Sequence, residues 1–324
     1  MKAIVQAKFG SPETLQLLDI EVPEIAEDEV LVRMQAASLN PADWHIVRGE
    51  PRVARLMGLG LTRPKNRVAG IDGAGIVEAI GTNVQDVRVG DEVFGFFQGS
   101  FAEFAVAEAG KVTQKPAQFT FQQAAALPIA ATTGMRGIRD IGEVQAGQRV
   151  LINGAAGGVG TFALQIAVAL GAEVSGVSSA RNGDLLRSLG AAHVIDYAAE
   201  DFTLGSTKYH VILDNTGNHP LGSLRRTMVT DGILLVNSGG SPGTVFGPIA
   251  FMASAMAVNV VVRQRLRLIP TRESRDDLRA LDEYIDAGQL APVVDKTYAL
   301  TEVVEGLRVV EGGHARGKLV IAIP

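Results

Sequence analysis

The chain of 324 residues contains no cysteine, and aromatic residues make up only 5% of it. Without cysteine the protein can form neither disulfide bonds nor a metal site built on thiolates. An excess of basic residues is also lacking, because the net charge is −5 with both signs interspersed. Since nucleic-acid proteins usually carry a basic face, we expect a globular protein with no nucleic-acid partner.

A long apolar run is absent as well. The first residues, MKAIVQAKFG, have too short an apolar core for a signal peptide. The most apolar later stretch, residues 249–262, is interrupted by Ser254 and Asn259. It is shorter than the roughly 20 residues that cross a bilayer, so we interpret it as a buried helix running into a strand. We therefore expect no membrane span and a cytoplasmic location.

The pattern of short apolar runs changes along the chain. Within residues 2–108 the runs are rich in Val, Ile, Phe and Ala and are punctuated by Gly, Pro, Asn and Asp. Closely spaced strands of this kind predict a barrel or rolled sheet. From Phe121 onward, strands alternate with helices, which predicts right-handed βαβ units and a parallel sheet covered on both faces. The predicted strands there are 149–153, 173–178, 193–197 and 232–240, with a strand and loop at 209–217, and the helices are 121–128, 132–141, 157–170, 183–190 and 220–228.

The last part of the chain returns to mixed elements. An amphipathic pattern over residues 273–288 predicts one helix. A strand at 293–300, a helix at 301–313 and a final strand at 317–323 follow.

A glycine-rich turn joins the strand at 149–153 to the next helix. Residues 154–160 read GAAGGVG and fit the pattern G-x-G-x-x-G with Ala155 at the first glycine. Gly157 lets the backbone approach a pyrophosphate, and Gly160 lets the helix pack against the strand. The helix N-terminus offers free N–H groups to the phosphates. In this strand–turn–helix context the pattern predicts a dinucleotide site; the alternative is a turn rich in glycine for packing alone.

The residues after the second strand of this unit indicate which dinucleotide binds. NAD sites usually place a carboxylate there for the ribose 2′-hydroxyl. Here Ser178 and Ser179 are followed by Arg181, and no carboxylate appears until Asp184. Two hydroxyls and a guanidinium favour the 2′-phosphate, so we predict NADPH. The alternative for Arg181 is a solvated residue at the start of a helix.

Six motifs spread along the chain together resemble those of a known protein family. They are SLNPADWHIVRG (38–49), GIDGAGIVEAIG (70–81), VGDEVFGF (89–96), AAALPIAATTG (124–134), NGAAGGVG (153–160) and EGGHARGKLV (311–320). Over nearly its whole length the chain resembles the medium-chain dehydrogenase/reductases, and within them the zinc-independent quinone oxidoreductase branch that includes zeta-crystallin-like proteins.

The resemblance implies an α/β fold, in which a Rossmann doubly wound parallel sheet accompanies a GroES-like β-barrel catalytic domain. Residues 1–120 would form the first part of the catalytic domain, 121–265 the NADP-binding domain, and 266–324 the return to the catalytic domain. Relatives are usually dimers paired through edge strands of their Rossmann sheets, so a homodimer is expected, with residues 249–262 as a possible contributor.

The zinc-dependent members of the family hold a catalytic metal through residues that this chain replaces. Asn40 stands at the first Cys, Ile71 and Asp72 at the His and Glu of a Gly-His-Glu motif, and Ile129 at the later ligand. One amide and two isoleucines cannot build a zinc site, so no metal is expected. Without a Lewis acid to stabilise an alkoxide, ordinary alcohol oxidation is disfavoured.

The chemistry that remains is hydride transfer to an electron-poor acceptor. Quinones and α,β-unsaturated carbonyls suit it, because conjugation spreads the negative charge and orientation supplies much of the catalysis. We therefore expect an NADPH-dependent, zinc-free quinone or enone reductase. The alternatives are an enal or enone reductase with little quinone activity, a non-catalytic NADPH-binding sensor or crystallin-like protein, and an enoyl reductase module of a larger synthase.

The candidate catalytic residues are Asn40, Asp43 and Thr133. Asn40 would donate its amide to the substrate carbonyl or contact the nicotinamide ribose, or it would only shape a turn before Pro41. The alternative to a catalytic role for Asp43 is that its side chain only orders the loop. Thr132 and Thr133 are expected to start a helix that the resemblance places against the nicotinamide, with N-capping as the alternative. No proton donor is evident in the sequence.

The remaining candidates would bind the cofactor. Tyr197 is expected to flank the adenine, and the loops after two strands of the sheet touch the ribose and nicotinamide in the family. Lys318 matches a lysine that reaches the cofactor in relatives. The predicted cofactor-binding set is Asn40, Thr133, Ala156, Gly157, Gly158, Val159, Ser178, Ser179, Arg181, Tyr197, Asn215, Thr216, Asn237, Ser238 and Lys318.

Overall fold

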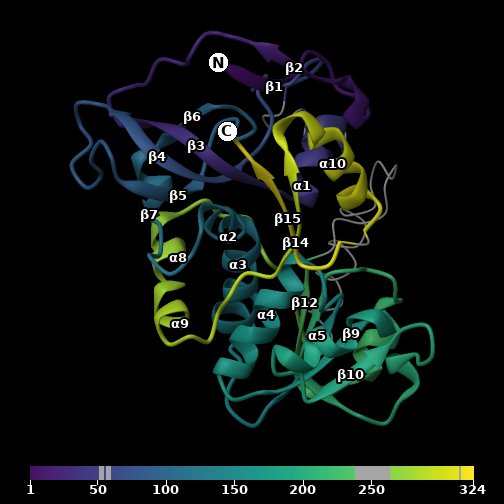
Figure 1. Cartoon of the computed structure of the whole chain (residues 1–324). Helices are drawn as coiled ribbons and strands as arrows, with labels where there is room; N and C mark the ends of the chain where they lie inside the picture. The colour runs from purple at the N-terminus through teal and green to yellow at the C-terminus, as the bar shows by residue number, and fades with distance from the viewer. Residues whose placement is uncertain (51–54, 56–59, 238–262, 314) are drawn as a thin grey trace. The chain divides into compact units, whose positions relative to one another are not determined.

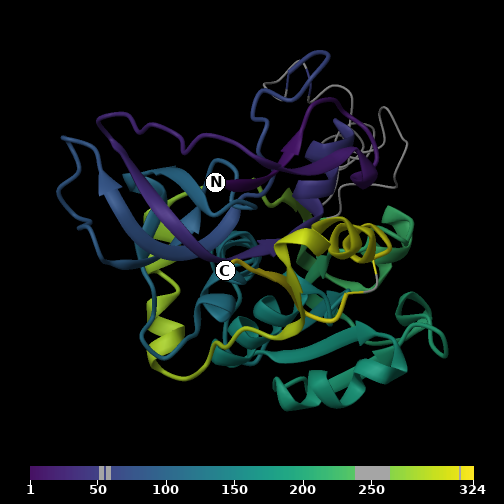
Figure 2. The same cartoon turned by 45° about the horizontal axis from the view of Figure 1, so that its top comes forward.

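The chain divides into two compact units in the computed structural model, which describes residues 1–50, 55, 60–237, 263–313 and 315–324. Unit 1 comprises Met1–Thr132, Arg272–Glu283 and Pro292–Pro324, and unit 2 comprises Thr133–Thr271 and Tyr284–Ala291 (Figure 1). Both termini therefore belong to unit 1 (Figure 2).

Unit 1 is built around a mostly antiparallel sheet. Its described strands run in the order β14 (Val294–Ala299), β15 (Lys318–Ala322), β3 (Glu29–Leu39), β4 (Asp72–Ile80), β5 (Glu92–Phe96) and β7 (Val112–Gln114), and β6 (Phe104–Glu108) also pairs with β3. A separate antiparallel pair joins β1 (Lys2–Gln6) to β2 (Leu15–Asp19). Because β15 pairs with β3, the sheet joins the two ends of the chain, as the resemblance implied.

Helices pack on this sheet and complete its core. α1 (Pro41–Arg48) packs against α10 (Val303–Glu311), α2 (Phe121–Ala125) lies on β3 and β4, and α8 (Arg275–Arg279) lies on β7. The apolar core is continuous from the strands to α1 and α10, since Met34, Trp44, Phe101, Tyr298 and Leu307 belong to one buried cluster.

Unit 2 is built on a parallel sheet. Its described strands run in the order β10 (His193–Asp196), β9 (Glu173–Ser178), β8 (Arg149–Asn153), β11 (Tyr209–Asp214), β12 (Met228–Val236) and β13 (Arg265–Leu268). The chain moves from β8 out to β9 and β10 and then returns to the other side of β8 as β11. This order confirms the predicted doubly wound sheet, and its switch point lies between β8 and β11.

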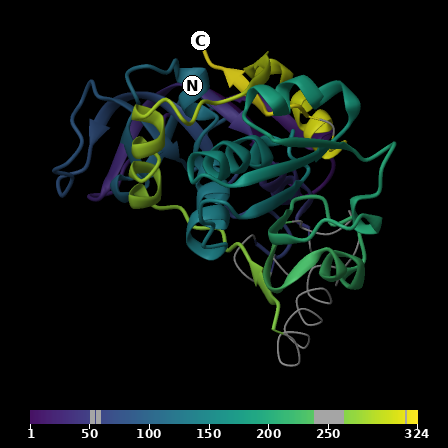
Figure 3. The same ribbon diagram turned by 90° about the horizontal axis from the view of Figure 1, so that it is seen from below.

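The helices of unit 2 cover the sheet. α4 (Gly158–Ala169) packs on β8 and β9, α5 (Gly183–Ser188) on β10, and α6 (Leu221–Arg226) on β12 (Figures 1 and 3). Residues such as Phe162, Leu164 and Ile166 of α4 are fully buried. α3 (Pro128–Met135) and α9 (Asp282–Asp286) each include residues of both units. Short turns of helix complete the described elements: Pro12–Thr14, Ala109–Lys111, Arg136–Ile141 (a π-helix), Ala180–Asn182, Phe202–Leu204 and Leu300–Glu302.

Three local predictions differ from the structure. The single helix expected at 273–288 is two helices, α8 and α9, because the Leu281 N–H bonds to the carbonyl of Leu278 and tightens the turn between them. Thr132 and Thr133 do not start a helix, since α3 begins at Pro128. β13 was not expected, and its RLRL sequence becomes a strand through parallel pairing with β12.

Two further expectations concern apolar segments. Residues 249–262, interpreted as a helix running into a strand, lie outside the described residues. Among the residues that are described, no helix combines the length and the apolar character needed to cross a bilayer.

Candidate functional site

The N-terminus of α1 holds the first two candidates. Asn40 is the N-cap in extended conformation, Pro41 is the first helical residue, and Asp43 Oδ2 accepts the Asn40 backbone N–H at 2.7 Å. Gly49 ends the helix in the left-handed region, with φ 63°. A turn before Pro41 was one of the alternatives for Asn40, and the structure has the start of a helix there. The sequence carried the signals for it: an N-cap Asn, Pro at N1, an acidic N3 residue and a C-terminal Gly.

The Asn40 side chain lies in a buried polar network. Its Nδ2 donates to Asp72 Oδ2 at 3.0 Å, and its Oδ1 accepts from Lys318 Nζ at 2.5 Å. Lys318 Nζ also donates to the Leu39 carbonyl at 3.0 Å. Asn40, Asp43 and Lys318 are each 2% exposed and Asp72 is fully buried. The fold thus joins α1, β4 and β15 through four polar side chains, all within unit 1.

Asp72 is the residue of this network that the sequence did not assign to the site. Its Oδ2 accepts from Asn40 Nδ2, from the Ile129 backbone N–H at 3.1 Å and from Ser38 Oγ at 3.4 Å. The Oδ1 atoms of Asp72 and Asp43 are buried and have no hydrogen-bond partner within the described part of the chain. A lone carboxylate between the glycines of GIDGAG was the available signal, because a charged side chain on a buried strand needs partners.

Burial dominates the electrostatics of the network. It raises the pKa of Asp43 to about 7, with the nearby Asp72 charge adding to the rise. It raises the pKa of Asp72 to about 6, against the opposing pull of Lys318 and of hydrogen bonds from Asn40. Burial lowers the pKa of Lys318, and both carboxylates oppose that fall. The three groups therefore depend on one another for their charge states.

Thr132 and Thr133 lie in the second half of α3. The Thr132 hydroxyl donates back to the Pro128 carbonyl at 2.5 Å, so N-capping does not describe it. Thr133 is partly exposed and is the first residue of unit 2.

The glycine loop after β8 has the geometry of a close backbone approach. Gly154 takes φ 77°, which a glycine tolerates without strain. A Cβ on Gly160 would meet the Gly154 carbonyl oxygen at 2.2 Å, so Gly160 is required for packing. A Cβ on Gly157, the N-cap of α4, would meet the same oxygen at 3.5 Å, an ordinary contact. The backbone at Gly157 thus faces open space at the helix N-terminus.

Polar side chains gather where the central strands of unit 2 end. Asn153 Nδ2, at the end of β8, donates to Asp214 Oδ1 at 2.9 Å, at the end of β11. Asn237 Nδ2, after β12, donates to Asn215 Oδ1 at 2.8 Å. Asn215 Nδ2 is buried and has no hydrogen-bond partner among the described residues. A donor without a partner at this edge fits a bound polar ligand. Ser238 lies outside the described residues.

The end of β9 presents the residues predicted to select the nucleotide. Ser178 is buried, whereas Ser179 is partly exposed and Arg181 is exposed. The Tyr197 N–H donates to the Ser178 carbonyl at 3.1 Å, and the Tyr197 side chain is 57% exposed. The tips of β9 and β10 therefore lie together, and Tyr197 follows the end of β10 with an exposed side chain.

The predicted residues thus form groups within each unit. In unit 1, Asn40, Asp43 and Lys318 share one network. In unit 2, the glycine loop and the loops after β9, β11 and β12 share the carboxyl edge of the sheet, where open α/β sheets bind ligands. Within the described ranges, no group of three His, Cys, Asp or Glu side chains is placed to hold a metal ion.

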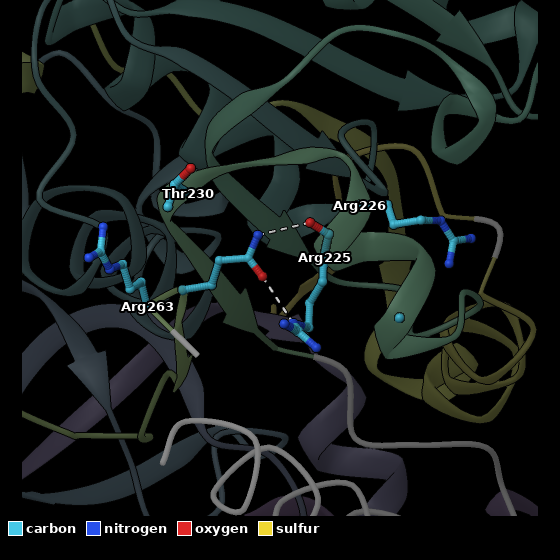
Figure 4. A pocket seen from close by; sticks show the side chains of 6 residues that line it. Arg225, Arg226, Thr230 and Arg263 are labelled. Atoms are coloured by element: carbon cyan, nitrogen blue, oxygen red, sulfur yellow. Dashed lines mark hydrogen bonds between the residues drawn. The ribbon is translucent and has the colours of Figure 1, made fainter. Parts of the chain in front are cut away.

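A separate hollow in unit 2 is lined by arginines. Figure 4 shows Arg225, Arg226 and Arg263 around it, with Thr230 at its rim. Arg225 Nε donates to Gln264 Oε1 at 2.9 Å. Thr230 lies near the start of β12, so this hollow is at the amino edge of the sheet, opposite the glycine loop.

Comparison with known proteins bears on the whole chain. Residues 26–117 match the family model for the alcohol dehydrogenase GroES-like domain, and residues 189–321 match the model described as zinc-binding dehydrogenase. The NADPH-dependent alkenal/one oxidoreductase of Arabidopsis thaliana, a chloroplastic protein, is 32% identical over 99% of this chain and 79% of its own length.

Two solved structures share the fold. The quinone oxidoreductase from Coxiella burnetii superposes with a TM-score of 0.86 at 30% identity and covers 100% of this chain and 99% of its own. The Escherichia coli quinone oxidoreductase complexed with NADPH has a TM-score of 0.83 at 25% identity, covering 99% of this chain and 100% of its own. The GroES-like and Rossmann parts predicted from the sequence are both confirmed.

Proposed function

We propose, since the chain belongs to the zinc-independent medium-chain dehydrogenase/reductases, that it transfers hydride from NADPH to a quinone or an α,β-unsaturated carbonyl. The observation that carries this proposal is the glycine loop at the N-terminus of α4, where Gly157 leaves the backbone open to a pyrophosphate.

The residues of unit 2 fit the nucleotide. The N–H groups of Gly158, Val159 and Gly160 begin α4 and lack an intrahelical carbonyl, so they are free to donate to phosphate oxygens. Asn215 Nδ2, which has no hydrogen-bond partner among the residues that the structure describes, supplies a further donor at the strand ends. Ala156, Thr216 and Asn237 complete the proposed set along this edge.

The tip of β9 supports NADPH over NADH. Ser178 ends the strand, Ser179 follows it, and Arg181 is exposed, so a 2′-phosphate bound here would meet hydroxyls and a guanidinium. Tyr197 offers its exposed ring for the adenine. The Arabidopsis relative is named as NADPH-dependent, and the Escherichia coli structure holds NADPH, which agrees with this choice.

The bound cofactor would supply the hydride, and the residues of this chain would bind and orient the reactants. Asn40, Asp43 and Thr133 remain the proposed catalytic set, in which Asp43 acts through Asn40, whose backbone N–H it accepts, and Lys318 remains a proposed cofactor contact. Asn40 directs its carbonyl to Lys318 and its amide nitrogen to Asp72, so the amide has one fixed orientation. The same proposal divides the chain into three parts. Catalysis belongs to residues 1–120 and 266–324, and NADP binding belongs to residues 121–265.

A second candidate is an enal or enone reductase with little quinone activity. The alkenal/one oxidoreductase from Arabidopsis favours it, because that protein matches at 32% identity over 99% of this chain. A non-catalytic NADPH-binding sensor remains the alternative outside enzymes, because a fold and a cofactor site do not by themselves prove chemistry. We also keep a homodimer and a cytoplasmic location as proposals, to be tested by light scattering and by fractionation of cells.

A panel of acceptors separates these candidates. Initial rates of NADPH oxidation are measured with a naphthoquinone, a simple enone and an alkenal, each with a chelator present. Turnover of the quinone supports the first candidate, and turnover of the enone and alkenal alone supports the second. Tight NADPH binding without turnover supports the sensor. Gly157→Ala is the control variant, assayed at NADPH concentrations well below the Kd, since a rate that this change leaves undiminished there does not come from the proposed cofactor site.

A further inference from the structure

The network around Asn40 has an unbalanced charge. It contains two carboxyl groups, on Asp43 and Asp72, and one ammonium group, on Lys318, all at most 2% exposed. With every group ionised the network would carry one net negative charge. An uncompensated charge away from water is costly, so buried groups take up or release protons until the charge is balanced.

One bound proton balances the network. The titratable groups that act on the pair come from three elements: Asp43 from α1, Asp72 from β4 and Lys318 from β15. The other partners, Ser38 of β3, Ile129 of α3 and Asn40, are uncharged. With one proton shared between the carboxyl groups, one anion faces one ammonium and the charge is zero.

The hydrogen bonds indicate which carboxyl group holds the proton. Asp72 Oδ2 accepts three donors, from Asn40, Ser38 and the Ile129 backbone, and these stabilise its anion. Asp43 Oδ2 accepts the Asn40 backbone N–H. The Oδ1 atoms of both groups are buried without a partner in the described structure, so the difference lies in the number of donors: three reach Asp72 Oδ2 and one reaches Asp43 Oδ2. The anion is therefore better held on Asp72 and the proton on Asp43, in agreement with a pKa of Asp43 raised to about 7 and of Asp72 to about 6.

We propose that Asp43 and Asp72 share one exchangeable proton and act as positioning residues, which hold the N-terminus of α1 and the Asn40 amide in their working arrangement while that proton is bound. Loss of the proton adds a second anion to the network, and this anion competes with the Asn40 and Leu39 oxygens for Lys318. Both oxygens belong to the end of β3 and the start of α1, so the change reaches the proposed catalytic residue directly. This inference rests on the proposed function only for its effect on turnover.

The first test follows turnover against pH. Wild-type kcat is expected to fall as pH rises through the ionisation of the shared proton, approaching about tenfold per pH unit above the midpoint. Asp43→Asn keeps an oxygen that can accept the Asn40 N–H but cannot ionise, so its residual kcat, whatever its size, is expected to lack this fall. Asp19→Asn, at an exposed position of β2 in the same unit, is the matched control and is expected to keep the wild-type profile.

The second test does not depend on turnover. Infrared spectra of the free wild-type protein are expected to show a protonated carboxyl band that disappears between pH 6 and 9 and is missing in Asp43→Asn. Asp72→Asn provides a second route if Asp43→Asn does not fold, because loss of either carboxyl group removes the excess negative charge and with it the shared proton. Absence of the band in the wild type overturns the inference, as does an unaltered fall of kcat in a folded Asp43→Asn variant. If the wild-type protein shows the band but reduces no acceptor, the shared proton is supported and the proposed function is refuted instead.

Discussion

Replacement of Gly157 by alanine separates the cofactor site from the stability of the fold. The added methyl group would meet the Gly154 carbonyl oxygen at 3.5 Å, and φ −81° at Gly157 is allowed for alanine. Alanine is a poorer N-cap than glycine by up to about 1 kcal/mol. It also restricts the unfolded chain, which stabilises the folded state by roughly 0.4–1 kcal/mol. These effects nearly cancel, so the free energy of unfolding is expected to change by less than about 1 kcal/mol.

Binding of NADPH is expected to respond differently. The methyl group would stand where the pyrophosphate approaches the backbone, so the affinity should fall at least tenfold, or about 1.4 kcal/mol. Denaturant unfolding of the free protein and titration with NADPH measure the two quantities. Gly160→Ala is the contrasting variant, because its methyl group would lie 2.2 Å from a backbone oxygen and should damage the fold itself. Unchanged NADPH affinity in a folded Gly157→Ala protein would refute the assignment of this loop.

Three further predictions address other parts of the site. Arg181→Ala is expected to weaken the binding of NADPH by about tenfold, since a hydrogen bond to a charged group contributes roughly 1.5–3 kcal/mol. The binding of NADH should not change, and equal effects on both cofactors would contradict the role given to Arg181. The pKa of Asp43 is raised from 3.8 to about 7, so the folded protein binds this proton more tightly than the unfolded chain does. The free energy of unfolding should therefore fall by about 4 kcal/mol as pH rises from about 4 to about 7. Denaturant unfolding of Asp43→Asn should show much less of this dependence on pH. Lys318→Met should destabilise the protein by about 3–5 kcal/mol, because it leaves a buried anion without its cation; a loss below 1 kcal/mol would show that Lys318 is not charged in the network.

The Rossmann part of the fold was open to prediction because its signals are local. Strands 149–153 and 173–178 were predicted with the bounds that the structure shows, since each is an apolar run that ends at a turn. The glycine loop stands between a strand and a helix in the sequence itself, so the proposal of a pyrophosphate site there needed no tertiary information. β13 is a four-residue strand in which Arg and Leu alternate, and it was not predicted, because its pairing with β12 is what makes it a strand.

The polar network was beyond sequence reasoning for the opposite reason. Asn40 and Lys318 are 278 residues apart, and they meet because β15 pairs with β3. The sequence identified Asp72 only as the residue that replaces a glutamate of the zinc motif. Its role in the network was not predictable, because its hydrogen-bond partners come from β3, α3 and the start of α1. The helix at Pro41–Arg48 is a different case: its capping residues were visible in the sequence, but no helix was predicted there, and a turn at the Asn-Pro pair was only one of the alternatives left open.

The central claim is metal-free hydride transfer from NADPH. The most direct test uses NADPH deuterated on the transferred face of the nicotinamide, with an enone acceptor and protein freed of metal by a chelator. Deuterium is expected on the reduced carbon of the product, at a rate that added zinc does not raise. Activity that disappears with the chelator and returns with stoichiometric zinc would contradict it, as would a product without deuterium from either face of the cofactor.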